Sequence, residues 1–144
     1  MASQVVEAHR AAAAIVRGDD AACRKKSVEA LEELGLPTGI LPLEDLEEFG
    51  YNREAGFMWL VQRKKKEHTF KKVKQTVSYA TEVTAFVEPG KLKKIVGVKT
   101  KELFIWLSVV EVYVEASAPG KVTFKTGAAG LSETFDAAAF ALGE

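Results

Sequence analysis

The stretch VKQTVSYATEVTAFV, residues 73–87, decides the fold that this sequence predicts. Large apolar side chains recur there on odd-numbered positions: Val73, Val77, Tyr79, Val83 and Val87. Polar side chains occupy most of the positions between them. Because successive side chains of a strand point to opposite faces, this period of two predicts a long β-strand with one buried face.

Further apolar segments follow at short intervals, separated by turns at Pro89-Gly90 and Pro119-Gly120. Residues 57–61 and 103–109 are apolar on both faces, so we expect strands that are covered on two sides. Other strands are expected over 92–98, with a bulge at Lys93-Lys94, and over 110–114, 122–124 and 131–135. About six to eight short strands joined in this way predict an antiparallel sandwich or closed barrel.

The N-terminal part has helical spacing instead. Apolar residues three and four positions apart predict a helix over residues 3–17 that ends at Gly18. Asp19 or Asp20 caps a second helix, which ends at Gly35. Between Pro42 and Phe49 we expect one further short helix.

The chain of 144 residues is long enough for one core and too short for two ordinary domains. We therefore predict a single α+β domain over 1–144. It comprises a helical segment (1–35), a turn-rich connection (36–56) and an antiparallel pseudo-barrel of two packed sheets (57–140). The single cysteine, Cys23, excludes an internal disulfide framework. No secretory signal or membrane-spanning run is recognisable, so an intracellular, cytoplasmic location is expected.

Several segments resemble a plant family called domain of unknown function 538. The residues that carry the resemblance are LGLPTGILP (34–42), GYNREAG (50–56), VSY (77–79), GKL (90–92), GVKTKELFIW (97–106) and Ser132 to Phe135. The text LEDLEEFGY (43–51) and KTKELFIW (99–106) is similar to the intracellular branch called smaller-trichomes-with-variable-branches-like. The resemblance implies helices before a pseudo-barrel of two antiparallel sheets, which has been compared with a lipid-binding barrel. It also implies an esterase-like role as one option, but it supplies no catalytic residues.

Positive charge is concentrated in the middle of the chain. Net charge is zero, yet residues 58–101 hold 12 basic and 3 acidic side chains. If the strands converge, one rim would carry His68 together with the candidate headgroup-binding cations: Arg63, Lys64, Lys65, Lys66, Lys71, Lys72, Lys74, Lys91, Lys93 and Lys94. Such clusters bind anionic lipid headgroups, but edge lysines also simply keep strands from aggregating. Nucleic acid is a poor candidate because few aromatic residues are interleaved with the cations.

The aromatic residues allow two interpretations, since a barrel can hold a small ligand or be filled by its own side chains. The filled core is the better supported one. The residues concerned are Trp59, Phe70, Tyr79, Phe104, Trp106 and Phe124.

Signals for catalysis and cofactors are weak. Ser132 lies in GLSET, which lacks the final glycine of a nucleophile elbow, and only His9 and His68 are available as bases. Two histidines cannot build a three-histidine metal site, and no phosphate-binding loop or dinucleotide motif is present, so no cofactor or metal is expected. The favoured function is non-catalytic binding of a lipid or other amphiphile with an anionic head, with peripheral membrane contact as one mode. The alternatives are an esterase acting on a lipid-like ester and a protein-interaction module, and the oligomeric state stays open.

Overall fold

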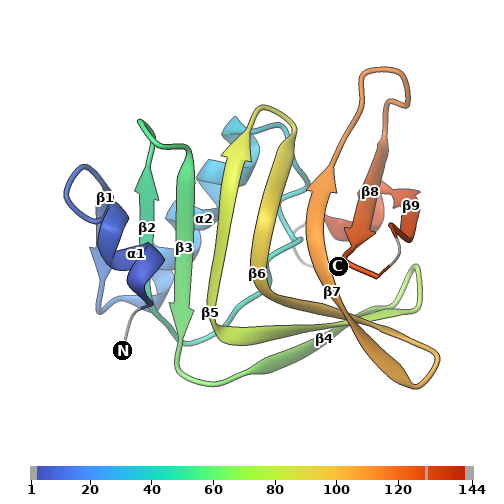
Figure 1. Ribbon diagram of the computed structural model, residues 1–144, viewed down its shortest axis with the longest axis horizontal. Coiled ribbons are helices and arrows are strands. Elements are labelled where there is room, and N and C mark those ends of the chain that lie inside the picture. Colours follow the sequence, from blue (N-terminus) through green and yellow to red (C-terminus); the bar gives the residue numbers. More distant parts are fainter. Residues whose placement is uncertain (1–2, 129, 142–144) are drawn as a thin grey trace.

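One continuous antiparallel sheet dominates the computed structural model, which describes residues 3–128 and 130–141 (Figure 1). Its strands in the described residues are β1 (Ala14–Arg17), β2 (Leu46–Asn52), β3 (Phe57–Gln62), β4 (Lys66–Phe70), β5 (Gln75–Glu88), β6 (Lys91–Glu102), β7 (Ile105–Tyr113), β8 (Lys121–Thr126) and β9 (Ser132–Asp136). The spatial order is β1-β2-β3-β5-β6-β7-β8-β9, and β4 pairs with β5 beside this path. The protein is thus mostly β, and the predicted pseudo-barrel of two packed sheets is wrong: a single sheet curves without closing.

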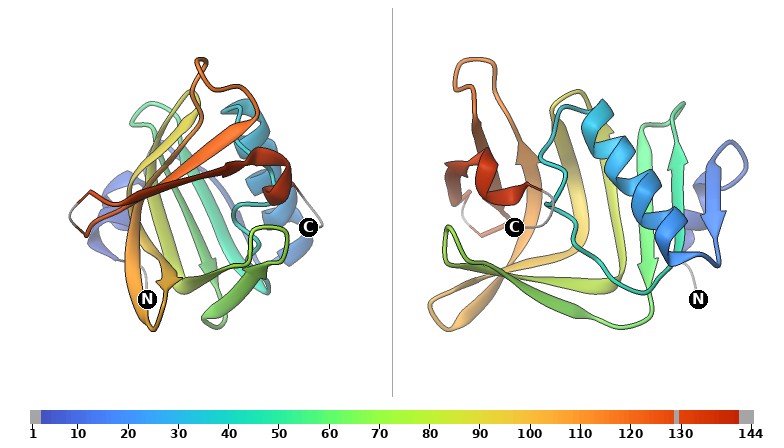
Figure 2. Two further views of the ribbon diagram at one scale, coloured as in Figure 1. Left: turned by 90° about the vertical axis from the view of Figure 1, so that its right-hand side faces the viewer. Right: turned by 180° about the vertical axis from the view of Figure 1, so that it is seen from behind.

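The sheet curves because β5 and β6 bend sharply. Their pairing shifts register between Tyr79 and Thr84, opposite Gly97, whose φ is 97°. A Cβ atom at Gly97 would lie 2.4 Å from the Glu82 carbonyl oxygen, so only glycine fits. A second irregularity, with a positive φ at Lys94, confirms the bulge expected at Lys93-Lys94. The ends of β4, β5, β6 and β7 therefore project sideways as an arm (Figures 1 and 2).

Two helices precede most of the sheet, α1 (Gln4–His9) and α2 (Asp20–Glu33), and a 3₁₀ helix, η1 (Ala137–Phe140), follows it. α2 begins and ends as predicted: the Asp19 side chain accepts a hydrogen bond from the Ala22 N–H, and Gly35 has φ 76°. The predicted helix over 3–17 is wrong beyond His9, because Ile15 and its neighbours pair with β2.

The predicted short helix between Pro42 and Phe49 is also wrong, because residues 46–52 form β2. Packing on both sides of this strand overrides the local helical signal. α2 packs on one face, and Trp59 of β3 lies on the other face against Gly50, at the site where a Cβ atom would sit.

The larger core lies in the concave side of the sheet, beneath α2 and the segment 36–45 (Figure 2). A smaller cluster of Val6, Phe57 and Trp59 lies beneath α1 on the outer face. There the buried Glu48 carboxylate accepts hydrogen bonds from Trp59 Nε1 (2.7 Å) and from both terminal nitrogens of Arg10 (2.9 and 3.1 Å). This arrangement fastens α1 to the sheet.

Candidate ligand-binding site

The predicted cations do not share one rim; the structure places them at three separate sites. Lys91, Lys93 and Lys94 lie near the β5–β6 turn, where Lys93 pairs with Glu88 at 2.8 Å. Arg63, Lys64 and Lys65 precede β4, and Lys66 donates to the Pro42 carbonyl (2.6 Å) and to Glu44 (2.9 Å). Lys71, Lys72 and Lys74 occupy the β4–β5 turn at the far end of the arm. The bends in β5 and β6 cause this separation.

Four of the six predicted cavity or core aromatics are core residues. Trp59, Phe70, Tyr79 and Phe124 are buried, whereas Trp106 is half-buried. Phe104 is 94% exposed, so its expected place in a core or cavity is wrong. It lies in the two-residue β6–β7 turn, where no described residue covers it.

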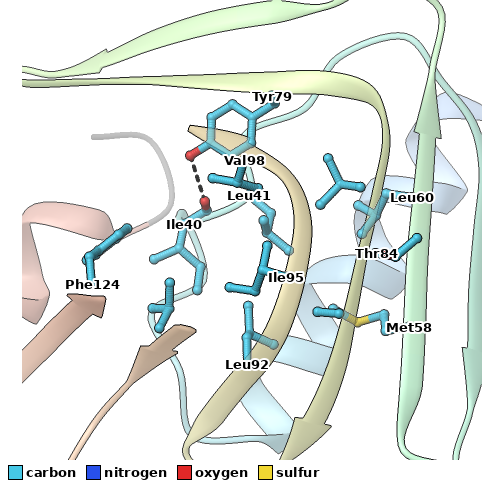
Figure 3. Close-up of a pocket in the computed structure, with 13 residues that line it drawn as sticks. Ile40, Leu41, Met58, Leu60, Tyr79, Thr84, Leu92, Ile95, Val98 and Phe124 are labelled. Carbon is cyan, nitrogen blue, oxygen red and sulfur yellow. Dashed lines mark hydrogen bonds between the residues drawn. The ribbon is translucent and has the colours of Figure 1, made fainter. Parts of the chain in front are cut away.

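The concave interior is filled rather than hollow. Apolar side chains from the sheet and the segment 36–45 leave a cavity of only about 20 Å³ (Figure 3). Space of that size holds about one water molecule. The Tyr79 side chain lies in this interior, and its hydroxyl donates a 2.8 Å hydrogen bond to the Ile40 carbonyl. An acyl chain therefore has no room at this position.

A larger cavity, of about 380 Å³, lies where the arm meets β8 and β9, and we call it the end cavity. This volume falls within the range of about 300–1,000 Å³ that is typical of small-molecule sites. Its walls are mostly apolar and come from the ends of β5, β6 and β7, from β8, β9 and η1. The lining residues are Gln75, Thr100, Glu102, Leu103, Ile105, Leu107, Phe124, Thr126, Leu131, Ser132, Glu133, Phe135 and Phe140.

A few polar groups converge in this apolar lining. The Gln75 amide donates hydrogen bonds to Thr100 Oγ1 (2.6 Å) and to the Lys101 carbonyl (3.0 Å). The carboxyls of Glu102 and Glu133 are hydrogen-bonded to each other. This contact, together with partial burial and the nearby charge of Glu102, raises the pKa of Glu133 to about 7. Near neutral pH Glu133 is therefore partly protonated, and the pair carries less negative charge than two ionised carboxylates.

Beside the end cavity, three consecutive apolar side chains project from the β6–β7 turn, and we call them the apolar tip. Leu103 is 89% exposed, Phe104 94% and Ile105 59%. Leu131, on the loop before β9, is 57% exposed and lines the same cavity. Leu103 also has φ 56°, in the left-handed region where a bulky side chain is strained. Such two-residue turns normally use Asn, Asp or Gly.

Comparison with known families supplies the context for this site. A family model described as "Protein of unknown function, DUF538" matches residues 27–141. The chain belongs to the DUF538 family. A curated relative, the uncharacterized protein At5g01610 of Arabidopsis thaliana, is 32% identical over 104 residues, which are 72% of this chain. The match spans 58% of that relative's length, so the chain covers less than two thirds of it. No solved structure matches the chain.

The residues considered for catalysis in this DUF538 chain lie in different places. Ser132 lines the end cavity, and His68 packs edge-on against Phe70 in β4, with ring centroids 4.5 Å apart. His9 stacks on Phe57 at 4.3 Å, at the other end of the molecule from β9 (Figure 1). Cys23 is buried, and that burial raises the pKa of its thiol. Over the described ranges, His, Cys, Asp and Glu side chains form no group of three that could hold a metal ion.

Most residues of the DUF538 end cavity could not be recognised from the sequence. Glu102, Glu133 and Gln75 are polar residues near strand ends, with no local signal of convergence. The apolar tip did carry a signal: four consecutive apolar residues, 103–106, without a turn former, at the start of the predicted strand over 103–109. An apolar run at a turn is a feature of exposed, functional surfaces. The predicted strand covered on both faces is wrong here, because residues 103 and 104 form an exposed turn.

Proposed function

We propose that this DUF538 chain binds an amphiphile without catalysis and that the apolar part of the ligand occupies the end cavity. The observation that carries the proposal is the cavity of about 380 Å³ with mostly apolar walls, next to a core that is otherwise filled. Removing a ligand's apolar surface from water supplies roughly 25 cal/mol per Å². At about 0.8 kcal/mol per buried methylene group, micromolar binding needs about ten such groups, and more once the cost of association is included.

The head of the ligand lies outside the cavity, and we propose that it is anionic. Lys71, Lys72 and Lys74 occupy the turn that leads directly into Gln75, which lines the cavity. All three side chains are exposed at this position. The proton shared by Glu102 and Glu133 limits repulsion of an anionic head, because the pair carries less negative charge than two free carboxylates.

An esterase acting on a lipid-like ester is the second candidate, favoured by the position of Ser132 in the cavity lining. A serine nucleophile requires a base within hydrogen-bond reach. His9 lies at the opposite end of the molecule, which leaves His68 as the base for this candidate. Turnover of a short-chain ester that is lost in Ser132→Ala would support the esterase. Turnover that persists in Ser132→Ala would exclude this residue as the nucleophile.

Filling the cavity tests the binding proposal. Leu107 is half-buried and lines the cavity, so Leu107→Trp places an indole in the space that the ligand tail would occupy. Val96→Trp is the matched control, because Val96 is 63% exposed on the outer face of β6, away from the cavity. With a fluorescent fatty acid at monomeric concentration, we expect Leu107→Trp to weaken binding at least about tenfold. Val96→Trp should bind like the wild type. Equal binding by all three proteins would contradict the proposal.

A further inference from the structure

We infer that the apolar tip inserts into the interface of a bilayer that contains anionic lipid. The three residues of the tip, 103–105, are consecutive and all more than half exposed. Isolated exposed apolar residues are ordinary on protein surfaces, but a contiguous apolar projection marks a contact with a partner or a membrane. Leu103 and Ile105 also line the end cavity, so the inference is tested at Phe104, the tip residue that does not line it.

The backbone of the turn supports a functional role for the tip. Leu103 has φ 56°, a conformation that glycine or asparagine adopts with less strain than leucine. Glycine or asparagine would also expose less apolar surface than leucine does at this position, where Leu103 is 89% exposed. Leucine at position 103 goes against both preferences, which indicates a role other than the stability of the free protein.

The residues just behind the tip match the composition of a membrane interface. Trp106 is half-buried, and the Lys101 ammonium lies 5.8 Å from the centroid of its ring. Tryptophan is enriched at the level of lipid headgroups, and lysine extends its charge from there towards water and phosphate. A tip of Leu, Phe and Ile below a Trp–Lys pair therefore has the polarity gradient of an interfacial anchor.

Positive charge at this end of the molecule favours an anionic membrane as the binding partner of the apolar tip. Lys71, Lys72 and Lys74 in the β4–β5 turn and Lys99 and Lys101 on β6 are all exposed. The two turns are adjacent, since Gln75 bonds to the Lys101 carbonyl and Val77 pairs with Thr100 (Figures 1 and 2). Glu67, Glu102 and Glu133 are the nearby carboxylates, and the last two share a proton. An anionic leaflet attracts such a surface, whereas a second copy of the chain would bring like charges together.

The test uses the whole chain and vesicles of phosphatidylcholine, with or without phosphatidylserine, in a flotation assay. We expect binding to the phosphatidylserine vesicles and at least about a tenfold loss of partitioning for Phe104→Ser. Val96→Ser removes another exposed apolar side chain, away from the tip, and should bind like the wild type. Lys71→Gln/Lys101→Gln should weaken binding, whereas Lys64→Gln/Lys65→Gln, at the β3–β4 turn, should not. Added salt should weaken binding by the wild type.

Insertion also has a spectroscopic signature. Trp106 fluorescence should shift to the blue and be quenched by brominated lipid, whereas Trp59 is fully buried and should not respond. Leu107→Trp should still bind vesicles, so failure of the cavity proposal leaves this inference standing. Wild-type protein that stays unbound, or Phe104→Ser that binds like the wild type, would overturn it. Self-association that Phe104→Ser abolishes, without vesicle binding, would also overturn it and assign the tip to a protein contact.

Discussion

The carboxyl of Glu133 on β9 is hydrogen-bonded to the carboxyl of Glu102 at the end of β6. These strands are not neighbours, because β7 and β8 lie between them in the sheet. The contact therefore crosses the end cavity and joins two of its walls. It requires a proton between the carboxyls, so the state of the cavity depends on pH near neutrality.

Stability should fall as the pH rises through the value at which this proton is lost. The pKa of Glu133 is raised to about 7 in the folded protein, above the ordinary value for a glutamate. A raised pKa means that the contribution to stability is complete at low pH and is lost as the pH approaches and passes about 7. Urea unfolding over this pH range should show the decline in the wild type, and Glu133→Gln should remove most of it.

The matched control for Glu133→Gln is Glu54→Gln, which neutralises an exposed carboxylate in the β2–β3 turn. It should leave the pH dependence unchanged. A Glu133→Gln protein that retains the pH profile of the wild type would show that the two carboxyls do not share a proton.

Substitution of Glu48 should lower the stability of the protein more than substitution of most other charged residues. Burial alone raises the pKa of its carboxyl, but hydrogen bonds from Arg10 and Trp59 outweigh burial and lower it. Its contribution to stability is therefore present at neutral pH and lost as the pH falls through the lowered value. Glu48→Gln should reduce the free energy of unfolding by about 3 kcal/mol, because Arg10 loses its buried carboxylate and keeps only the exposed Glu7. Glu47→Gln, an exposed neighbour on β2, should change it by less than about 0.5 kcal/mol. Equal effects in the two variants would contradict this account of Glu48.

The bend at Gly97 should not tolerate a side chain. Gly97→Ala combines a φ of 97° with a Cβ atom 2.4 Å from a backbone oxygen, so we expect a loss of more than about 2 kcal/mol. Gly127→Ala is the control, because its Cβ atom would meet only Val110 Cγ1 at 3.5 Å. Thermal unfolding of the two variants compares them directly. A Gly97→Ala protein as stable as Gly127→Ala would show that β5 and β6 do not need this bend.

Tyr79→Phe should cost about 1–2 kcal/mol, since it leaves the buried Ile40 carbonyl without the hydroxyl that donates to it (Figure 3). Tyr113→Phe changes a half-buried phenol and serves as the control in denaturant unfolding. If the two substitutions are equally mild, the hydroxyl of Tyr79 does not stabilise the segment 36–45.

The strands were predictable where the signal is local. Alternation over residues 73–87 and the Pro89-Gly90 turn correspond to β5 and the turn that follows it. The capping residues of α2 were likewise visible in the sequence, because Asp19 and Gly35 act on adjacent backbone groups. In contrast, Ala14–Arg17 became a strand only because the edge of β2 is there to pair with it. The spacing of apolar residues in this segment does not indicate which strand it pairs with.

The site was less predictable because it depends on where distant segments end. Ten cations from separate segments of the sequence were expected to converge, but the bends in β5 and β6 place them at three separate sites. The sequence predicts Phe104 as a core residue, but the pairing of Glu102 with Ile105 places it in the β6–β7 turn. Glu102 and Glu133 meet only because the ends of the β6–β7 and β8–β9 hairpins face each other across the cavity.

The position of the ligand tail tests the central claim most directly. A monomeric lysophospholipid with a lauroyl chain, titrated into methyl-labelled protein, should give intermolecular NOEs from the chain to the methyls of Ile105, Leu107 and Leu131. Methyls of the filled interior, such as those of Leu60 and Ile95, should give none. NOEs to the interior methyls, or no NOEs to the end cavity at a saturating concentration, would contradict the account.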